Sequence, residues 1–319
     1  QSCSFDNKSG IWKNDNNISK EEKDIFSEFE TMFSTNNTFD KIVSVEKNFQ
    51  FKLTSQVNNS KWTDIFYNQD NNYKNFTYND NNKVIFKSKK ISRSKMNNFI
   101  LFNDNNIISS DHKGNIIIFS LTEKKIIKKF NFYKKRYKKI KKNLNLLVEN
   151  DIIYISDNLG YLYALEYKKD KLLWAKNYKI PFKSNLKILK NNLIAANQNN
   201  NLYFINKING NISQLIPTEE TIVKNSFINN LSLNNSYSLF LNTYGSLYAI
   251  DNQTLKIKWF LNLNQTLSLN PSNLFMGNQI LISKDKVIIS ANQYTYILDI
   301  NTGSIIYKVN FSSLLKPFI

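Results

Sequence analysis

The sequence predicts an all-β fold, a β-propeller built from four-stranded blades, and three observations support this. Short apolar runs rich in Ile, Leu, Tyr and Phe alternate with turns rich in Asn, Asp and Gly, which is typical of strands. A turn, strand, turn, strand pattern recurs five times. We call the residue at which each copy starts its register position, and these residues are 114, 160, 200, 245 and 293, which are 46, 40, 45 and 48 residues apart. The spacing from Gly160 to Trp174 is 14 residues, as is the spacing from Gly245 to Trp259.

The repeat length and the strand count both point to propeller blades. Repeats of this length are typical of propellers. Two further apolar runs precede each register position, such as NLLVE and DIIYISD before Gly160, so each repeat supplies four strands. Blades of four antiparallel strands, stacked radially, form a propeller.

The residue 14 positions after each register position lies on the outer strands of its repeat. This slot holds Lys128, Trp174, Gln214, Trp259 and Tyr307. We expect the aromatic residues Trp174, Trp259 and Tyr307 to be structural and to fill the wedge between adjacent blades.

The composition is compatible with a large core and leaves the origin of the charge open. The chain has 319 residues, 41% of them hydrophobic, and no run approaches the ~18 apolar residues of a membrane span. Its net charge is +18, but Asn, Lys and Ile are abundant throughout, as an AT-rich coding bias would produce. The alternative is a basic surface that meets an anionic partner, such as a lipid headgroup or an acidic protein.

Three segments are expected along the chain. Residues 1–18 form a tether, residues 19–40 an amphipathic helix and linker, and residues 41–319 the propeller, with five clear repeats from about residue 98 onward. The final SLLKPFI resembles the entry into another repeat, which predicts a truncated C-terminus and an incomplete ring. If the chain is complete, six blades must close, with N-terminal strands supplying the missing part.

Cys3 is the only cysteine, so an internal disulfide is excluded. It follows the small residue Ser2 and precedes a polar stretch to residue 18, an arrangement typical of a lipoprotein in which the cysteine carries the lipid. We therefore expect lipidation at Cys3. The alternative is an unmodified thiol near the start of the chain.

One helix is predicted from Ser19 to Phe33. Ser19 and Glu22 form a capping box. Apolar residues then recur at helical spacing at Ile25, Phe26, Phe29, Met32 and Phe33. This stripe is expected to pack against the propeller or the outgoing chain, with binding to a partner or a membrane surface as the alternative.

The most basic segment is Tyr133–Asn143, with the sequence YKKRYKKIKKN. Interleaved tyrosines and cations can bind nucleic acid or acidic lipid. The segment falls between the last strand of one repeat and the first strand of the next, which favours a solvated connection. We expect no nucleic-acid partner.

No catalytic constellation is present in the sequence. His112 is the only histidine, so no histidine-based metal site or acid–base pair of histidines can form. Glu166, Asp251 and Asp299 occupy one repeat position, which indicates turn chemistry at a strand end. We therefore expect no enzyme activity, no metal and no cofactor.

The repeat core G-x-L-Y-A-[LI]-[DE], followed by a turn and an aromatic, resembles the quinoprotein-type (PQQ-like) propeller repeat over roughly residues 60–319. Its dehydrogenase form implies eight tryptophan-rich blades, a calcium ion and a vicinal cysteine pair. This chain has one cysteine and two tryptophans in repeat positions, and it is too short for that form. The non-catalytic form, the BamB-like outer-membrane assembly lipoproteins, is the closer resemblance because of the tethered Cys3.

That resemblance implies a scaffold of the outer-membrane β-barrel protein assembly machinery. Its partners would be the barrel-forming subunit and unfolded outer-membrane proteins, and its location the periplasmic face of the outer membrane, through a lipid anchor. The alternative is a PQQ-like propeller enzyme or a small-ligand sensor in the periplasm. The resemblance also implies docking through connections between blades, here Glu219, Glu220, Ile222, Val223, Lys224, Leu269, Asn270 and Pro271.

Overall fold

The computed structural model describes residues 3–5, 12–14, 55–57, 61–76, 83–84, 86–219, 229–264, 275, 277–291, 293–313 and 316. The chain divides into two compact units, Gln1–Phe49 and Gln50–Ile319. No helix in the described ranges is long and apolar enough to cross a membrane. The helix expected over Ser19 to Phe33 lies outside the described residues.

The first unit contains a short strand pair where the sequence predicted only a polar tether. Strand β1 (Cys3–Phe5) pairs antiparallel with β2 (Trp12–Asn14), and the register places Phe5 opposite Trp12. Aromatic residues favour strands, and the intervening sequence NKSG favours a turn, so a strand pair can form even in a polar stretch.

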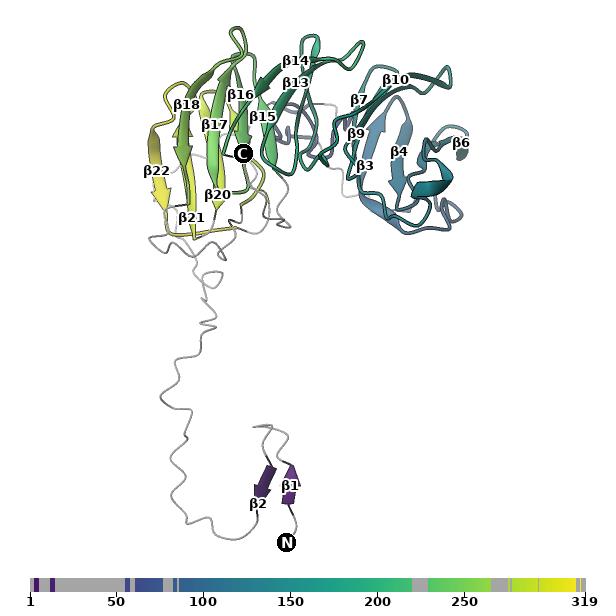
Figure 1. Ribbon diagram of the computed structural model, residues 1–319, viewed down its shortest axis with the longest axis horizontal. Coiled ribbons are helices and arrows are strands. Elements are labelled where there is room, and N and C mark those ends of the chain that lie inside the picture. Colours follow the sequence, from purple (N-terminus) through teal and green to yellow (C-terminus); the bar gives the residue numbers. More distant parts are fainter. Residues whose placement is uncertain are drawn as a thin grey trace. The chain divides into compact units, whose positions relative to one another are not determined.

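Within its described residues, the second unit contains five four-stranded antiparallel sheets, named blades 1 to 5 in chain order. In each blade the four strands are hydrogen-bonded in sequence order. Figure 1 shows the blades following one another from β3 to β22. The predicted all-β fold of four-stranded blades is confirmed, and each blade is a separate, open sheet.

The strand bounds follow the repeat. Blade 1 has β3 (Met96–Asn103), β4 (Asn106–Asp111), β5 (Ile116–Ser120) and β6 (Lys125–Phe130). Blade 2 has β7 (Leu144–Glu149), β8 (Ile152–Asp157), β9 (Tyr161–Glu166) and β10 (Lys171–Asn177). Blade 3 has β11 (Lys187–Leu189), β12 (Asn192–Ala196), β13 (Leu202–Asn206) and β14 (Ile212–Ile216). Blade 4 has β15 (Asn230–Leu233), β16 (Tyr237–Leu241), β17 (Ser246–Asp251) and β18 (Ile257–Asn262). Blade 5 has β19 (Leu281–Ser283), β20 (Lys286–Ala291), β21 (Tyr294–Asp299) and β22 (Ile305–Val309). A short 3-10 turn, η1 (Lys135–Tyr137), lies between blades 1 and 2.

The hydrophobic core lies between consecutive blades. Successive side chains of a strand point to opposite faces of its sheet. In β8, Ile153 and Ile155 therefore join the cluster shared with blade 1, while Tyr154 joins the cluster shared with blade 3. Two further clusters join blade 3 to blade 4 and blade 4 to blade 5. Burial on both faces explains why inner strands such as β5 and β8 consist of nearly continuous apolar residues.

In blades 1, 2 and 4 the fourth strand contacts the next blade through the slot residue. The Trp174 indole N–H donates to the Lys207 carbonyl at 2.9 Å, and the Trp259 indole N–H donates to the Ile300 carbonyl at 2.9 Å. Both carbonyls lie in the turn between the third and fourth strands of the following blade. Tyr307, in blade 5, is 61% exposed.

The turn residue of the next blade that contacts the slot side chain differs according to the residue in the slot. Gly210 and Gly303 have positive φ, and a Cβ on either glycine would lie 2.7 Å or 2.6 Å from the ring of Trp174 or Trp259. Where the slot holds Lys128, the equivalent turn position holds Asp170, and the two form an ion pair at 2.8 Å. At Lys128, Trp174 and Trp259 the slot residue is thus matched by the turn on which it packs.

The turn acids behave as their sequence position predicted. The Asp251 carboxylate accepts backbone N–H bonds from Gln253 and Thr254, and the Asp299 carboxylate accepts them from Asn301 and Thr302. These N–H groups hold the pKa of both carboxyls below its usual value. They cap turns and are not arranged as an active site.

The slot aromatics should differ in their contribution to stability. Truncating a large buried aromatic to alanine costs about 3 to 5 kcal/mol, so Trp174→Ala should lower the free energy of unfolding by about that amount. Trp259 is half-buried, so Trp259→Ala should cost less than Trp174→Ala but more than the exposed control. Tyr307→Ala is the matched control, and because the side chain is exposed we expect a change within about 0.5 kcal/mol. Urea unfolding measures all three. Near-parental stability of both tryptophan variants would contradict the packing role.

Candidate functional site

The centre of the second unit is occupied by the chain's own residues 61–76. The first strand of each blade is an edge strand that faces the common axis of the five blades. Residues 62–71 cross these edges one after another and bind to each of them. We call residues 61–76 the axial segment, and no pattern in the sequence predicted its position.

The axial segment makes hydrogen bonds to the first strand of every described blade. Its backbone pairs with Phe102 of β3, Val148 of β7, Leu233 of β15 and Ile282 of β19, at 2.7 to 3.1 Å. The Asn71 side-chain amide donates to the carbonyls of Leu231 and Ile280, at 3.0 and 2.9 Å. Edge groups that would otherwise face the axis unpaired are satisfied in this way.

The contact with blade 3 is a buried ion pair. The Lys187 ammonium in β11 donates to the Asp64 carboxylate at 2.6 Å, to the Asn71 side-chain oxygen at 2.6 Å and to the Asn68 carbonyl. The side chains of Lys187 and Asp64 are 0% and 1% exposed. Burial raises the pKa of Asp64 and lowers the pKa of Lys187, and the charge of each partner opposes the shift of the other.

A second lysine binds the axial segment from the far end of the chain. The Lys316 ammonium donates to the Phe66 carbonyl at 3.2 Å and lies 3.6 Å from the centre of the Tyr73 ring. Burial, together with the nearby charge of Lys187, lowers the pKa of Lys316 to about 8.

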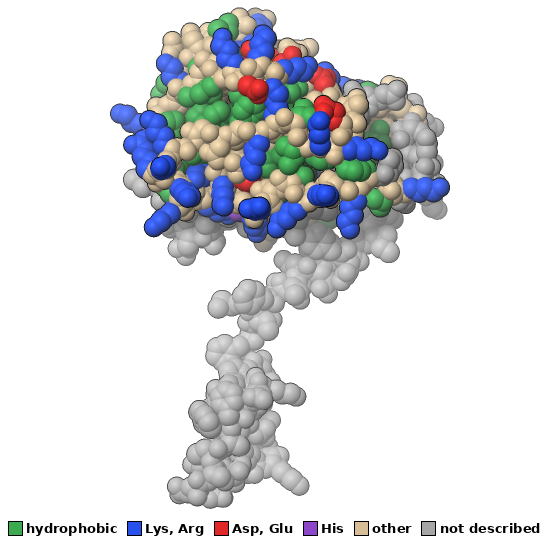
Figure 2. Space-filling model, turned by 90° about the vertical axis from the view of Figure 1, so that its right-hand side faces the viewer, with side chains coloured by type: hydrophobic (Ala, Val, Ile, Leu, Met, Phe, Trp, Pro, Cys, Tyr) green, Lys and Arg blue, Asp and Glu red, His purple; other side chains and the backbone are tan. Residues whose placement is uncertain are grey.

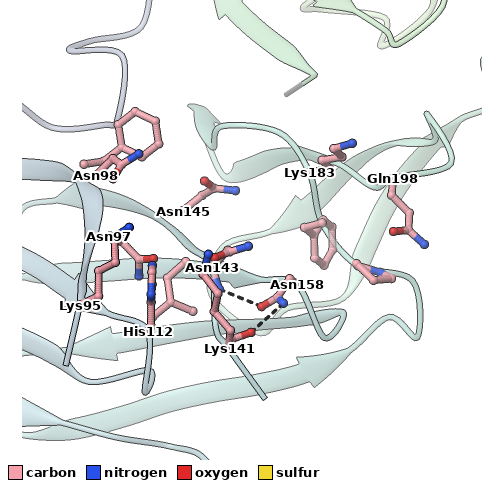
Figure 3. Close-up of a pocket in the computed structure, with 14 residues that line it drawn as sticks. Lys95, Asn97, Asn98, His112, Lys141, Asn143, Asn145, Asn158, Lys183 and Gln198 are labelled. Atoms are coloured by element: carbon pink, nitrogen blue, oxygen red, sulfur yellow. Dashed lines mark hydrogen bonds between the residues drawn. The ribbon is translucent and has the colours of Figure 1, made fainter. Parts of the chain in front are cut away.

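A cleft of about 710 Å³ opens over blades 1 to 3, and Figure 3 shows its lining. We call it the cationic cleft. Its side chains come from equivalent places in three consecutive blades. Lys95, Lys141 and Lys183 lie in the segments that lead into the first strands, and His112, Asn158 and Gln198 lie in the turns between the second and third strands. The other lining residues are Asn97, Asn98, Phe99, Asn143, Leu144, Asn145, Pro181 and Phe182.

The lining carries positive charge and amide groups and contains neither Asp nor Glu. Within the described part of the chain, no carboxylate forms an ion pair with Lys95, Lys141 or Lys183. The Asn158 amide fixes one wall, because it accepts from the Asn143 backbone N–H at 2.9 Å and donates to the Lys141 carbonyl at 3.0 Å. The dashed lines in Figure 3 mark these bonds.

The basic segment Tyr133–Asn143 does connect two blades, but it is more than a solvated loop. Lys142 is buried, and its ammonium donates to the Tyr137 carbonyl and lies 5.0 Å from the centre of the Tyr133 ring. The Tyr133 hydroxyl donates to Asp157 at 2.7 Å. These contacts hold the segment in place, so that Lys141 and Asn143 line the cleft.

The residues predicted from sequence to dock a partner fall mostly outside the described residues. Glu220, Ile222, Val223, Lys224, Leu269, Asn270 and Pro271 all belong to that group. Glu219 is described, and its carboxylate accepts from Ser246 at 2.5 Å and Asn242 at 3.3 Å in blade 4. Cys3 is the first residue of β1.

Two features of the centre and its rim were missed by the sequence reasoning. Lys187 stands among apolar residues of a first strand, and that placement is the signal for a buried partner. For the cleft, the signal is the recurrence of a lysine shortly before the first strands of three successive blades, at Lys95, Lys141 and Lys183.

No protein-family model and no curated protein matches the sequence. Many solved structures share its fold, among them these three. BamB from Moraxella catarrhalis superimposes with a TM-score of 0.56 at 12% identity, covering 66% of this chain and 63% of that chain. The computationally designed Ika8 protein gives a TM-score of 0.54 at 12% identity, covering 66% and 61%. A europium-containing methanol dehydrogenase gives 0.59 at 13% identity, covering 80% and 58%.

These similarities define the class of the protein as a β-propeller of the type found in BamB and methanol dehydrogenase. The chain spans less than two thirds of the length of each of the three structures. At 12–13% identity they show the fold, and the two natural proteins among them differ in function.

The Asp64–Lys187 pair should dominate the stability of the centre. Asp64→Asn leaves a buried ammonium without its counter-ion, which typically costs about 3 to 5 kcal/mol. We expect a loss of this size in urea unfolding. The double variant Asp64→Asn/Lys187→Met should lose clearly less than the sum of the two single changes, because each single change strands its partner. Additive losses would contradict a direct coupling.

His112 should report the charge of the cleft. Partial desolvation and the charges of Lys141 and Lys95 hold its pKa below the ordinary value, while Asp111 acts in the opposite direction. Because His112 is the only histidine, its imidazole gives one set of NMR signals that can be titrated with pH. Lys141→Gln should raise this pKa, and added salt should raise it by screening. The exposed control Lys171→Gln should leave the pKa of His112 unchanged. If Lys141→Gln also leaves it unchanged, the Lys141 charge does not act on His112.

Proposed function

We propose that this protein is a non-catalytic binding propeller that serves as a scaffold of the outer-membrane β-barrel assembly machinery. Its partners would be the barrel-forming subunit and unfolded outer-membrane proteins. A lipid on Cys3 would hold it at the periplasmic face of the outer membrane. The shared fold with BamB supports this proposal, as does the position of Cys3 before a polar stretch.

The observation that carries the proposal is the axial segment. A propeller enzyme or sensor of the alternative class would use its central channel for a ligand. Here residues 62–71 are hydrogen-bonded to the innermost strands of all five described blades. A ligand there would have to displace the buried Asp64–Lys187 pair. The binding surface is therefore expected on the loops at the ends of the blades and not in the channel.

The polar groups at the axis are also better suited to holding the axial segment in place than to binding a metal or a quinone. The Lys187 ammonium engages the Asp64 carboxylate and the Asn71 side-chain oxygen, so these groups are satisfied by one another. In the described ranges, no three His, Cys, Asp or Glu side chains are grouped as a metal would require.

The loops between blades provide the means of binding. The described connections 131–143 and 178–186 lead into the first strands of blades 2 and 3, and parts of both line the cationic cleft. By the repeat, the predicted docking connections around Ile222 and Pro271 lead into the first strands of blades 4 and 5. All four connections thus occupy the same repeat position.

The proposal is tested by association with the barrel-forming subunit. Replacing Ile222 and Val223 with aspartate should weaken association by about 2 to 4 kcal/mol, because central apolar anchors dominate such interfaces. The matched control is Ile208→Asp/Ile212→Asp, which makes the same change at two exposed positions of blade 3. Association measured with purified parent and variants should fall only in the first pair.

Two results would contradict the proposal. Failure of the parent protein to bind the subunit would remove the scaffold role, and equal binding by the Ile222→Asp/Val223→Asp variant would remove this connection from the interface. Quinone-dependent dye reduction by the purified protein would support the enzyme alternative instead.

A further inference from the structure

We propose that the cationic cleft over blades 1 to 3 binds an extended acidic segment of a partner protein. This inference rests on the proposed function as a protein-binding propeller. It specifies the chemistry of one partner segment that the propeller would bind. It concerns a different surface from the connections around Ile222 and Pro271.

The charge of the cleft is the first support. Lys95, Lys141 and Lys183 line one cleft with His112, and the lining contains no carboxylate. Lys183 is half-buried, and this burial lowers its pKa because no counter-ion offsets the loss of water. Carboxylates entering the cleft would supply the missing negative charge, and hydrogen bonds between ionised partners are the stronger kind.

Some lysines of blades 1 and 2 differ from the cleft lysines in having an acidic partner. Lys128 pairs with Asp170 at 2.8 Å, and Lys168 pairs with Asp151 at 2.7 Å. Figure 2 shows many Lys and Arg side chains on the side that carries blade 1, with few Asp and Glu. A specific site must therefore be tested against this background of surface charge.

The shape and the amides of the cleft favour a peptide over a small anion. The lining repeats across three consecutive blades, so a ligand that contacts all of it must span them. The amides of Asn98, Asn143 and Gln198 each offer donors and an acceptor, as the alternating N–H and C=O groups of an extended peptide require. Phe99, which is half-buried, adds apolar surface for peptide side chains. A single phosphate or carboxylate would use only part of this lining.

The test is direct binding of a synthetic peptide to the purified chain. The probe is a short fluorescein-labelled peptide of alternating Glu and Thr, and its control has Gln in place of Glu. The triple variant Lys95→Gln/Lys141→Gln/Lys183→Gln should bind the Glu peptide on the order of tenfold more weakly, since each exposed ion pair contributes a modest amount. The matched control is Lys171→Gln/Lys256→Gln/Lys258→Gln, which removes the same charge from exposed positions on and beside the fourth strands of blades 2 and 4.

His112 provides an independent readout in the same samples. Saturation with the Glu peptide should shift the His112 imidazole signals and raise its pKa, because carboxylates offset the field of Lys95 and Lys141. The Gln peptide should do neither. These measurements separate occupancy of the cleft from attraction to the charged surface as a whole.

Several outcomes would overturn the inference. Equal weakening in both triple variants, or equal binding of the Glu and Gln peptides, would show that the cleft does not select an acidic segment. Inorganic phosphate or phosphatidylglycerol vesicles that shift His112, where the Glu peptide does not, would replace the peptide by a phosphate-bearing ligand. The peptide experiment does not use the barrel-forming subunit. If the peptide does not bind, the proposed function is therefore not contradicted. If the subunit does not bind, the peptide result can still be interpreted.

Discussion

The rest of the fold depends on the axial segment and on the buried pair between Asp64 and Lys187. Five blades stacked side by side present five edge strands to one axis, and edge groups left unpaired away from water are costly. The axial segment pairs with all five, and the Lys187 ammonium fixes it by three contacts. The centre of the propeller is thus a built structure and not an open channel.

Two sets of contacts hold neighbouring blades together, one at the axis and one at the periphery. At the periphery, Trp174 packs on Gly210, Trp259 packs on Gly303, and Lys128 pairs with Asp170. The chain itself occupies both sets of contacts, and the recognition surface that we propose lies instead on the loops at the ends of the blades. The cationic cleft lies on that surface, and this is why we place recognition there.

The repeating part of the fold could be predicted from sequence, whereas the centre and the cleft could not. Regular spacing identified the four strands of each blade and the turns at Asp251 and Asp299, since local hydrogen bonds fix both. The axial segment has no hydrophobic period, and Asp64 lies 123 residues before its partner Lys187. Such long-range pairing leaves no local signal. The cleft was missed because Lys95, Lys141 and Lys183 meet only once the blades are stacked.

Hydrogen exchange of individual backbone amides tests the central claim most directly. The amides of Val148, Leu233 and Ile282 donate to carbonyls of the axial segment, at Thr63, Gln69 and Asp70. If the segment closes the centre, these three amides should exchange as slowly as the most protected amides of the blades, through global unfolding. Fast exchange at these three positions, while the blade cores stay protected, would show that the centre is open and would contradict the account.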